Sequence, residues 1–92
     1  MTDITIHHDS AARRFWTEVE GEQAELVYRQ LPDRISIDHT GVPPAIGGRG
    51  IAGALVKAAL EYARQQGWKV IPACSYAADY VQRHPEYADV LA

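Results

Sequence analysis

The chain has 92 residues, of which 47% are hydrophobic and 23% are charged, and its formal net charge is −3. This length allows one hydrophobic core, so we expect a single domain over residues 1–92, and the composition is typical of a folded globular protein. The nine Lys and Arg residues are spread along the chain. That spread argues against nucleic acid as a partner, because phosphate binding needs a concentrated basic patch.

Cysteine content and hydropathy indicate the compartment. Cys74 is the only cysteine, so no internal disulfide can form, which favours a reducing, cytoplasmic location. The first residues lack the positive segment and apolar run of a secretion signal. The longest apolar stretch is too short and too interrupted to cross a bilayer, so we expect no membrane partner.

The first half of the chain predicts an antiparallel meander of short strands. Tight turns at residues 20–22 and 32–33 separate segments in which apolar and polar residues alternate. In the last segment Ile35, Ile37 and His39 fall on one face and the residues between them on the other. The expected strands are residues 4–7, 13–19, 24–31 and 34–40.

The second half changes to a helical period. Apolar residues recur at helical spacing over 51–63, which predicts an amphipathic helix with Gly67 as its C-terminal cap. A short apolar strand over 68–74 follows, then a helix over 76–83 capped by Ser75, and a last helical turn over 85–91.

The element order is therefore β-β-β-β-α-β-α. It predicts an α/β (α+β) fold with a mixed, mostly antiparallel sheet of about five strands. The strand–helix–strand unit over 34–74 should be a right-handed crossover, which would make its two strands parallel.

Five of the seven glycines stand between residues 41 and 53. Those at 47, 48 and 50 lie between a predicted strand and a helix N-terminus, where unpaired backbone N–H groups and the helix dipole attract anions. Such a loop suits a pyrophosphate. The alternative is a connector that only lets the chain turn. A Walker loop is excluded because Ile51 and Ala52 follow Gly50, and a dinucleotide fingerprint fits poorly.

Four short motifs of the second half belong together. They are His39-Thr40-Gly41-Val42-Pro43-Pro44, Gly48-Arg49-Gly50-Ile51-Ala52, Cys74-Ser75-Tyr76 and Arg83-His84-Pro85-Glu86-Tyr87. Over residues 33–92 they resemble the minimal, single-domain members of the GNAT acyl-CoA N-acyltransferase superfamily. The superfamily signature is Gln/Arg-x-x-Gly-x-Gly/Ala. Gly50 and Ala52 match its last two places, whereas Gly47 stands where Gln or Arg is usual.

The resemblance implies acetyl-CoA as co-substrate, with its pyrophosphate on the backbone amides of the signature. It also implies that the strands before and after the signature helix splay apart and admit the acyl-pantetheine arm, which segment 39–42 would line. The implied cofactor-binding residues are Val42, Gly47, Gly48, Arg49, Gly50, Ile51 and Ala52.

Cys74 and His39 are the candidate catalytic residues. A cysteine before a helix can be activated by the helix dipole, although most lone cysteines are small buried hydrophobes. A histidine on an apolar strand face is more often a hydrogen-bonded core residue than a catalyst. The minimal family carries Cys and His at these places, so the resemblance favours a role for both. Either Cys74 accepts the acetyl group, or the amine attacks the thioester directly while His39 removes its proton.

Other candidates are weaker. His7, His8 and Asp9 are adjacent on a strand and would point to alternate faces, so we expect no metal site. Tyr80 lies one residue away from the place where many GNAT enzymes carry a tyrosine acid, and core packing is its expected role. The hairpin over 18–25 is acidic, and it is either a solvated turn or an attraction for a cationic amine.

The sequence thus predicts an acetyl-CoA-dependent N-acetyltransferase acting on an unidentified amine, on a peptide, a protein or a small molecule. One alternative is a coenzyme-A-binding module or partner subunit without catalysis. Another is an interaction domain with no ligand, in which the glycines serve only the turn.

Overall fold

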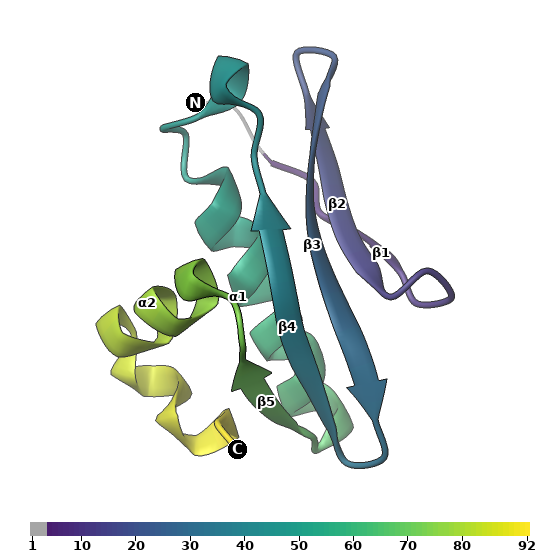
Figure 1. Cartoon of the computed structure of the whole chain (residues 1–92), viewed down its shortest axis with the longest axis vertical. Helices are drawn as coiled ribbons and strands as arrows, with labels where there is room; N and C mark the ends of the chain where they lie inside the picture. Colours follow the sequence, from purple (N-terminus) through teal and green to yellow (C-terminus); the bar gives the residue numbers. More distant parts are fainter. Residues whose placement is uncertain (1–3) are drawn as a thin grey trace.

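The computed structural model describes residues 4–92 and contains one five-stranded sheet (Figure 1). Neighbouring strands follow chain order, β1-β2-β3-β4-β5, and all pairs are antiparallel except β4 with β5. The predicted fold class and element order are confirmed. The elements are β1 His7–Asp9, β2 Arg14–Val19, β3 Glu22–Leu31, β4 Arg34–Gly41, the 3-10 helix η1 Pro44–Ile46, α1 Ile51–Gln66, β5 Lys69–Pro72, α2 Ser75–Arg83 and the 3-10 helix η2 Pro85–Val90.

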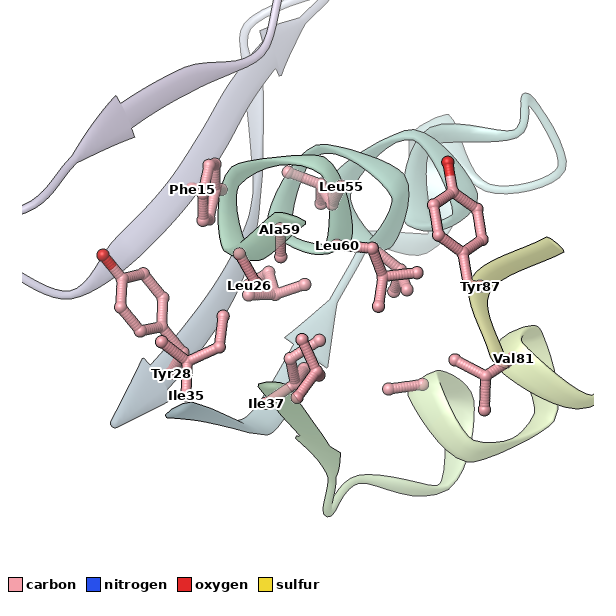
Figure 2. Close-up of a cluster of buried hydrophobic side chains, with 14 of the residues drawn as sticks. Phe15, Leu26, Tyr28, Ile35, Ile37, Leu55, Ala59, Leu60, Val81 and Tyr87 are labelled. Carbon is pink, nitrogen blue, oxygen red and sulfur yellow. The ribbon is translucent and has the colours of Figure 1, made fainter. Parts of the chain in front are cut away.

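The core lies between one face of the sheet and the two α-helices (Figure 2). Strand residues alternate in burial, as in β3, where Ala24, Leu26 and Tyr28 are buried. These meet the apolar stripe of α1, and α2 closes the core with Ala77 and Val81. The buried residues of α1 are Ile51, Leu55, Val56, Ala59, Leu60 and Ala63.

The first predicted strand is displaced toward the C-terminus. We expected it over 4–7, but β1 covers His7–Asp9 and pairs with β2 through His7↔Trp16 and its two neighbours. The preceding segment is held differently, because the Thr17 hydroxyl donates a 2.7 Å hydrogen bond to the Thr5 carbonyl. In this segment a side-chain hydrogen bond replaces the backbone hydrogen bonds of a strand pair. The alternation of apolar residues in the sequence does not distinguish these two arrangements.

The other boundaries differ by a few residues. β5 is shorter than the predicted 68–74, α1 continues to Gln66, and η1 between β4 and the glycine loop was not predicted. Gly67 does cap α1, with φ 75° and its N–H bonded to the carbonyls of Ala63 and Arg64.

His8 joins a small aromatic cluster at the β1 edge of the sheet. Its ring stacks on Phe15 at 4.0 Å between centroids and meets the edge of Tyr62 at 4.4 Å. Its Nε2 is hydrogen-bonded to the Tyr28 hydroxyl at 2.6 Å. Burial against these groups lowers the pKa of His8, an effect that Asp9 partly opposes. The folded state therefore binds a proton at His8 less readily than the unfolded chain does.

We expect this cluster to make stability depend on pH. The contribution of His8 is complete above the unfolded pKa of about 6.5 and is lost as pH falls below it, because only the unfolded chain then gains the proton. Denaturant unfolding at pH 7 and pH 5 should show a smaller loss on acidification in His8→Gln than in the parent chain. An equal loss in both would contradict the assignment.

Candidate functional site

β4 and β5 diverge near the middle of β4. Their parallel pairing runs from Arg34↔Lys69 to Ile37↔Pro72, and the Cys74 N–H then donates to the Ile37 carbonyl at 2.9 Å. β4 continues to Gly41, well past the end of β5 (Figure 1). Beyond Ile37 no strand in residues 4–92 pairs with this edge of β4. Its backbone groups are available there to an extended ligand.

A cavity of about 270 Å³ lies beside this open edge, between the glycine loop and α2. Gly48 and Gly50 have φ values of +77° and +75°, which glycine adopts without strain. A Cβ on either residue would meet no atom within 4 Å, so the loop leaves open space above its backbone. The lining residues are Val42, Gly47, Gly48, Gly50, Ile51, Ala52 and Tyr76.

The N-terminus of α1 points its unpaired N–H groups at this loop. Gly50 is the N-cap and offers no side chain, and the first turn contains no acidic residue. The first intrahelical bond runs from the Ala54 N–H to the Gly50 carbonyl. The N–H groups of Ile51, Ala52 and Gly53 thus have no acceptor within the helix. Together with the dipole of this 16-residue helix, they favour an anion at the cavity.

Cys74, not Ser75, is the N-cap of α2. Its backbone is extended, with φ −87° and ψ 153°, and Sγ accepts a hydrogen bond from the Ala77 N–H at 3.4 Å. Ser75 instead becomes the first helical residue. The half-buried thiol also lies 3.6 Å from the Thr40 hydroxyl. Thr40 belongs to segment 39–42, which was expected to line the pantetheine arm, but its contact with Cys74 was not predicted.

A β-bulge in β4 reverses the sheet faces toward which its last side chains point. Val27 pairs with His39 and Tyr28 with Ile37, which leaves Asp38 as the extra residue. Asp38 accepts hydrogen bonds from the Arg29 Nε and the Ser36 hydroxyl, both at 2.6 Å, on the face away from the core. Since a bulge shifts alternation by one residue, Thr40 turns toward the helices beside Cys74.

His39 consequently lies on the opposite face of the sheet from Ile35 and Ile37. The prediction that these three residues share a face is wrong, because it assumed unbroken alternation. His39 is exposed, and its ring lies over Gly41, where a Cβ would come within 2.9 Å of Nε2. The structure therefore does not bring the side chains of His39 and Cys74 to the same face of β4.

His39 lines a second cavity, of about 410 Å³. Its walls come from β2, β3 and the end of β4, on the face away from the helices. Val42 lines both this cavity and the glycine-loop cavity. The lining residues are Arg14, Gln23, Glu25, His39, Gly41, Val42 and Pro43.

Comparison with known proteins identifies the family. The GCN5-related N-acetyl-transferase family matches residues 14–90. The chain belongs to this family. It is 38% identical over 85 residues to Protein NATD1 of Gallus gallus, covering 89% of this chain and 77% of that protein. Homo sapiens NATD1 gives 38% identity with 89% and 75% coverage. The NMR structure of a GCN5-like protein from Staphylococcus aureus matches with a TM-score of 0.74 and 33% identity, over 100% of this chain and 91% of that one.

Two residues of the GNAT signature segment differ from expectation. Gly47 replaces a larger residue, and the Arg49 side chain is bonded away from the cavity. Gly47 has φ −67° and ψ 159°, and a Cβ there would make an ordinary 3.4 Å contact with the Pro44 carbonyl oxygen. The backbone thus has room for the larger side chain usual in the family. Arg49 does not line the cavity, because its guanidinium is hydrogen-bonded to Glu20 in the β2–β3 turn. A contact between Arg49 and a coenzyme stays a prediction.

Two tyrosines of α2 lie near the GNAT signature helix. Tyr80 packs against the core and stacks on His84 at 3.9 Å between centroids. Burial, with Glu86 and two other neighbours, raises the pKa of Tyr80. Tyr76 is 39% exposed and lines the glycine-loop cavity. Tyr76 belongs to the Cys74-Ser75-Tyr76 motif, but no role was predicted for it.

Within residues 4–92, no three or more His, Cys, Asp or Glu side chains are grouped so that they could hold a metal ion. None of the helices in this part of the chain is long and apolar enough to span a membrane.

Proposed function

We propose that this GNAT family member transfers the acetyl group of acetyl-CoA to an amine. The observation that carries the proposal is the glycine-loop cavity, which lies at the uncapped N-terminus of α1 and beside the unpaired end of β4. The backbone N–H groups at this helix start would hold the pyrophosphate of coenzyme A. The pantetheine arm would then run along segment 39–42, where β4 has backbone groups free for hydrogen bonding.

Cys74 and Thr40 lie 3.6 Å apart, just beyond the last pair of β4 with β5 and on the helix side of the sheet. The thioester would lie beside them. In the covalent route the Cys74 sulfur attacks the thioester carbonyl carbon, the C–S bond to coenzyme A breaks, and the acetyl group then passes to the amine. In the direct route the amine nitrogen attacks the same carbon, and the coenzyme A thiolate leaves with a proton. The separation of His39 from Cys74 counts against the covalent route, because the thiol does not have His39 beside it as a base.

A non-catalytic coenzyme-A-binding module is the second candidate, and the separation of His39 from Cys74 favours it. Such a module would retain the glycine-loop cavity without needing either side chain. The predicted cytoplasmic location belongs equally to both candidates and rests on the lone cysteine.

Acetyl-CoA should raise the thermal stability of the protein. A hundredfold excess over Kd adds about 2.7 kcal/mol, which corresponds to roughly 10–20 °C for a domain of this size. Differential scanning fluorimetry with acetyl-CoA, followed by mass spectrometry of amine acceptors, measures binding and transfer separately. No thermal shift would overturn both coenzyme functions, whereas a shift without transfer to any peptide or polyamine would favour the module.

Cys74→Ala separates the two catalytic routes. If the direct route operates, we expect the variant to keep most of its transfer activity and to lose only the Sγ contacts to Ala77 N–H and Thr40. Intact-mass measurement after incubation with acetyl-CoA should then show no acetyl adduct on the parent chain. An adduct that disappears in Cys74→Ala, together with loss of transfer, would establish the covalent route instead. Cys74→Ser provides the control, because it keeps a helix cap.

A further inference from the structure

Tyr76 is the exposed aromatic side chain of the glycine-loop cavity. It is 39% exposed, and among the residues that the structure describes no other large hydrophobic side chain is classed as exposed. It lies in the cavity wall together with Gly47, Gly48 and Gly50. Tyrosine combines an apolar ring with a hydroxyl that forms hydrogen bonds, so this position suits contact with a polar ligand.

The hydroxyl of Tyr76 lies over the first turn of α1. A Cβ added to Gly53 would be 3.4 Å from the Tyr76 hydroxyl oxygen. Gly53 is the third residue of α1, and its N–H is one of the three at this helix start that have no acceptor within the helix. The hydroxyl is therefore a side-chain donor close to the backbone donors that face the glycine loop.

The start of α2 fixes the position of Tyr76. The Cys74 N–H donates to the Ile37 carbonyl at 2.9 Å, which ties the residue before α2 to β4. The Cys74 sulfur also accepts a hydrogen bond from the Ala77 N–H and so caps the turn that carries Tyr76. A side chain presented from a fixed helix end loses less freedom on binding than one from a mobile loop.

We propose that Tyr76 is a coenzyme-binding residue, whose hydroxyl donates a hydrogen bond to the pyrophosphate at the N-terminus of α1. The inference rests on the proposed function, because that pyrophosphate belongs to acetyl-CoA. A hydrogen bond to a charged phosphate oxygen is stronger than one between neutral groups. The pyrophosphate is favoured over the acyl end of the coenzyme, since Tyr76 lines the cavity with the loop glycines, whereas Thr40 and Cys74 do not line it.

Tyr76→Phe tests this hydrogen bond, because it removes the hydroxyl and leaves the ring in the cavity wall. Isothermal titration calorimetry should give an affinity for acetyl-CoA about three- to tenfold lower than that of the parent chain. Tyr80→Phe is the matched control and should bind like the parent. Tyr80 lies one turn further along α2 and its ring also faces Gly53, but it does not line the cavity. Equal affinities of the parent and Tyr76→Phe would overturn the proposal.

Phosphorus NMR of acetyl-CoA bound at saturation locates the contact. The pyrophosphate resonances of the bound coenzyme should differ between the parent chain and Tyr76→Phe, because one donor to the phosphate oxygens is missing. The resonance of the separate ribose phosphate should be the same in both, and Tyr80→Phe should match the parent throughout. Identical pyrophosphate resonances in the parent and Tyr76→Phe would place the hydroxyl elsewhere and overturn the proposal.

The failure of this role and the failure of the proposed function give different results. If acetyl-CoA neither binds to the parent chain nor raises its thermal stability, the proposed function fails and the role of Tyr76 fails with it. If acetyl-CoA binds equally to the parent chain and Tyr76→Phe, only the role of Tyr76 fails.

Discussion

Gly50→Val is expected to abolish the thermal stabilisation that the proposed binding of acetyl-CoA predicts. Gly50 has φ +75° and lines the cavity, and a Cβ there points into space free of other atoms within 4 Å. A branched side chain would occupy the space above the N–H groups that begin α1. A pyrophosphate would lose its room and its access to these backbone donors. Differential scanning fluorimetry with and without acetyl-CoA measures the difference.

Gly67→Val is the matched control for this variant. Gly67 also has φ +75° and open space at its Cβ position, but it caps the far end of α1. Both substitutions place a side chain in the left-handed region and should cost at least about 1–2 kcal/mol of stability. Only Gly50→Val should also lose the response to acetyl-CoA. Retention of the full shift in Gly50→Val would contradict the assignment of the glycine loop.

Leu26→Ala should produce a large loss of stability. Leu26 is completely buried under α1, next to Phe15 on β2 and to Thr40 on β4 (Figure 2). Removing its side chain leaves a cavity and costs about 2–5 kcal/mol. That is a large share of the roughly 5–15 kcal/mol that stabilises a domain, and it lowers Tm by roughly 10–30 °C. Denaturant and thermal unfolding measure both quantities.

Leu91→Ala removes the same atoms from a half-buried position near the C-terminus. Because less apolar surface returns to water and little cavity forms, its cost should be about 1 kcal/mol. Similar losses for Leu26→Ala and Leu91→Ala would mean that the sheet does not pack on α1 as described.

The secondary structure was largely predictable because its signals are local. The switch from strand alternation to helical spacing at Ile51, and the glycine at position 67, locate α1 from neighbouring residues alone. The ends of the strands and helices were less predictable. β1 begins at the first residue that pairs with β2. Cys74 is the N-cap of α2 because its sulfur accepts a hydrogen bond from the Ala77 N–H.

The glycine-loop site was also largely predictable, since its residues are consecutive in the chain. All but Arg49 of the predicted cofactor-binding residues line the cavity. Arg49 is diverted by Glu20, a residue of the distant β2–β3 turn. Tyr76 enters the cavity from α2, and only the packing of α2 against α1 at Gly53 brings it there.

The sequence by itself determined the order of the elements, the parallel pair at the end of the sheet, and the glycine-rich start of α1, because each depends on short-range spacing. The tertiary structure alone decided which side chains meet. The alternation of residues 34–40 carries no sign of a bulge. Asp38 is the extra residue of that bulge, and Arg29 on β3 and Ser36 bind its carboxylate. That single displacement turns Thr40 toward Cys74 and His39 toward the open face, since strand side chains alternate and one extra residue reverses every side that follows.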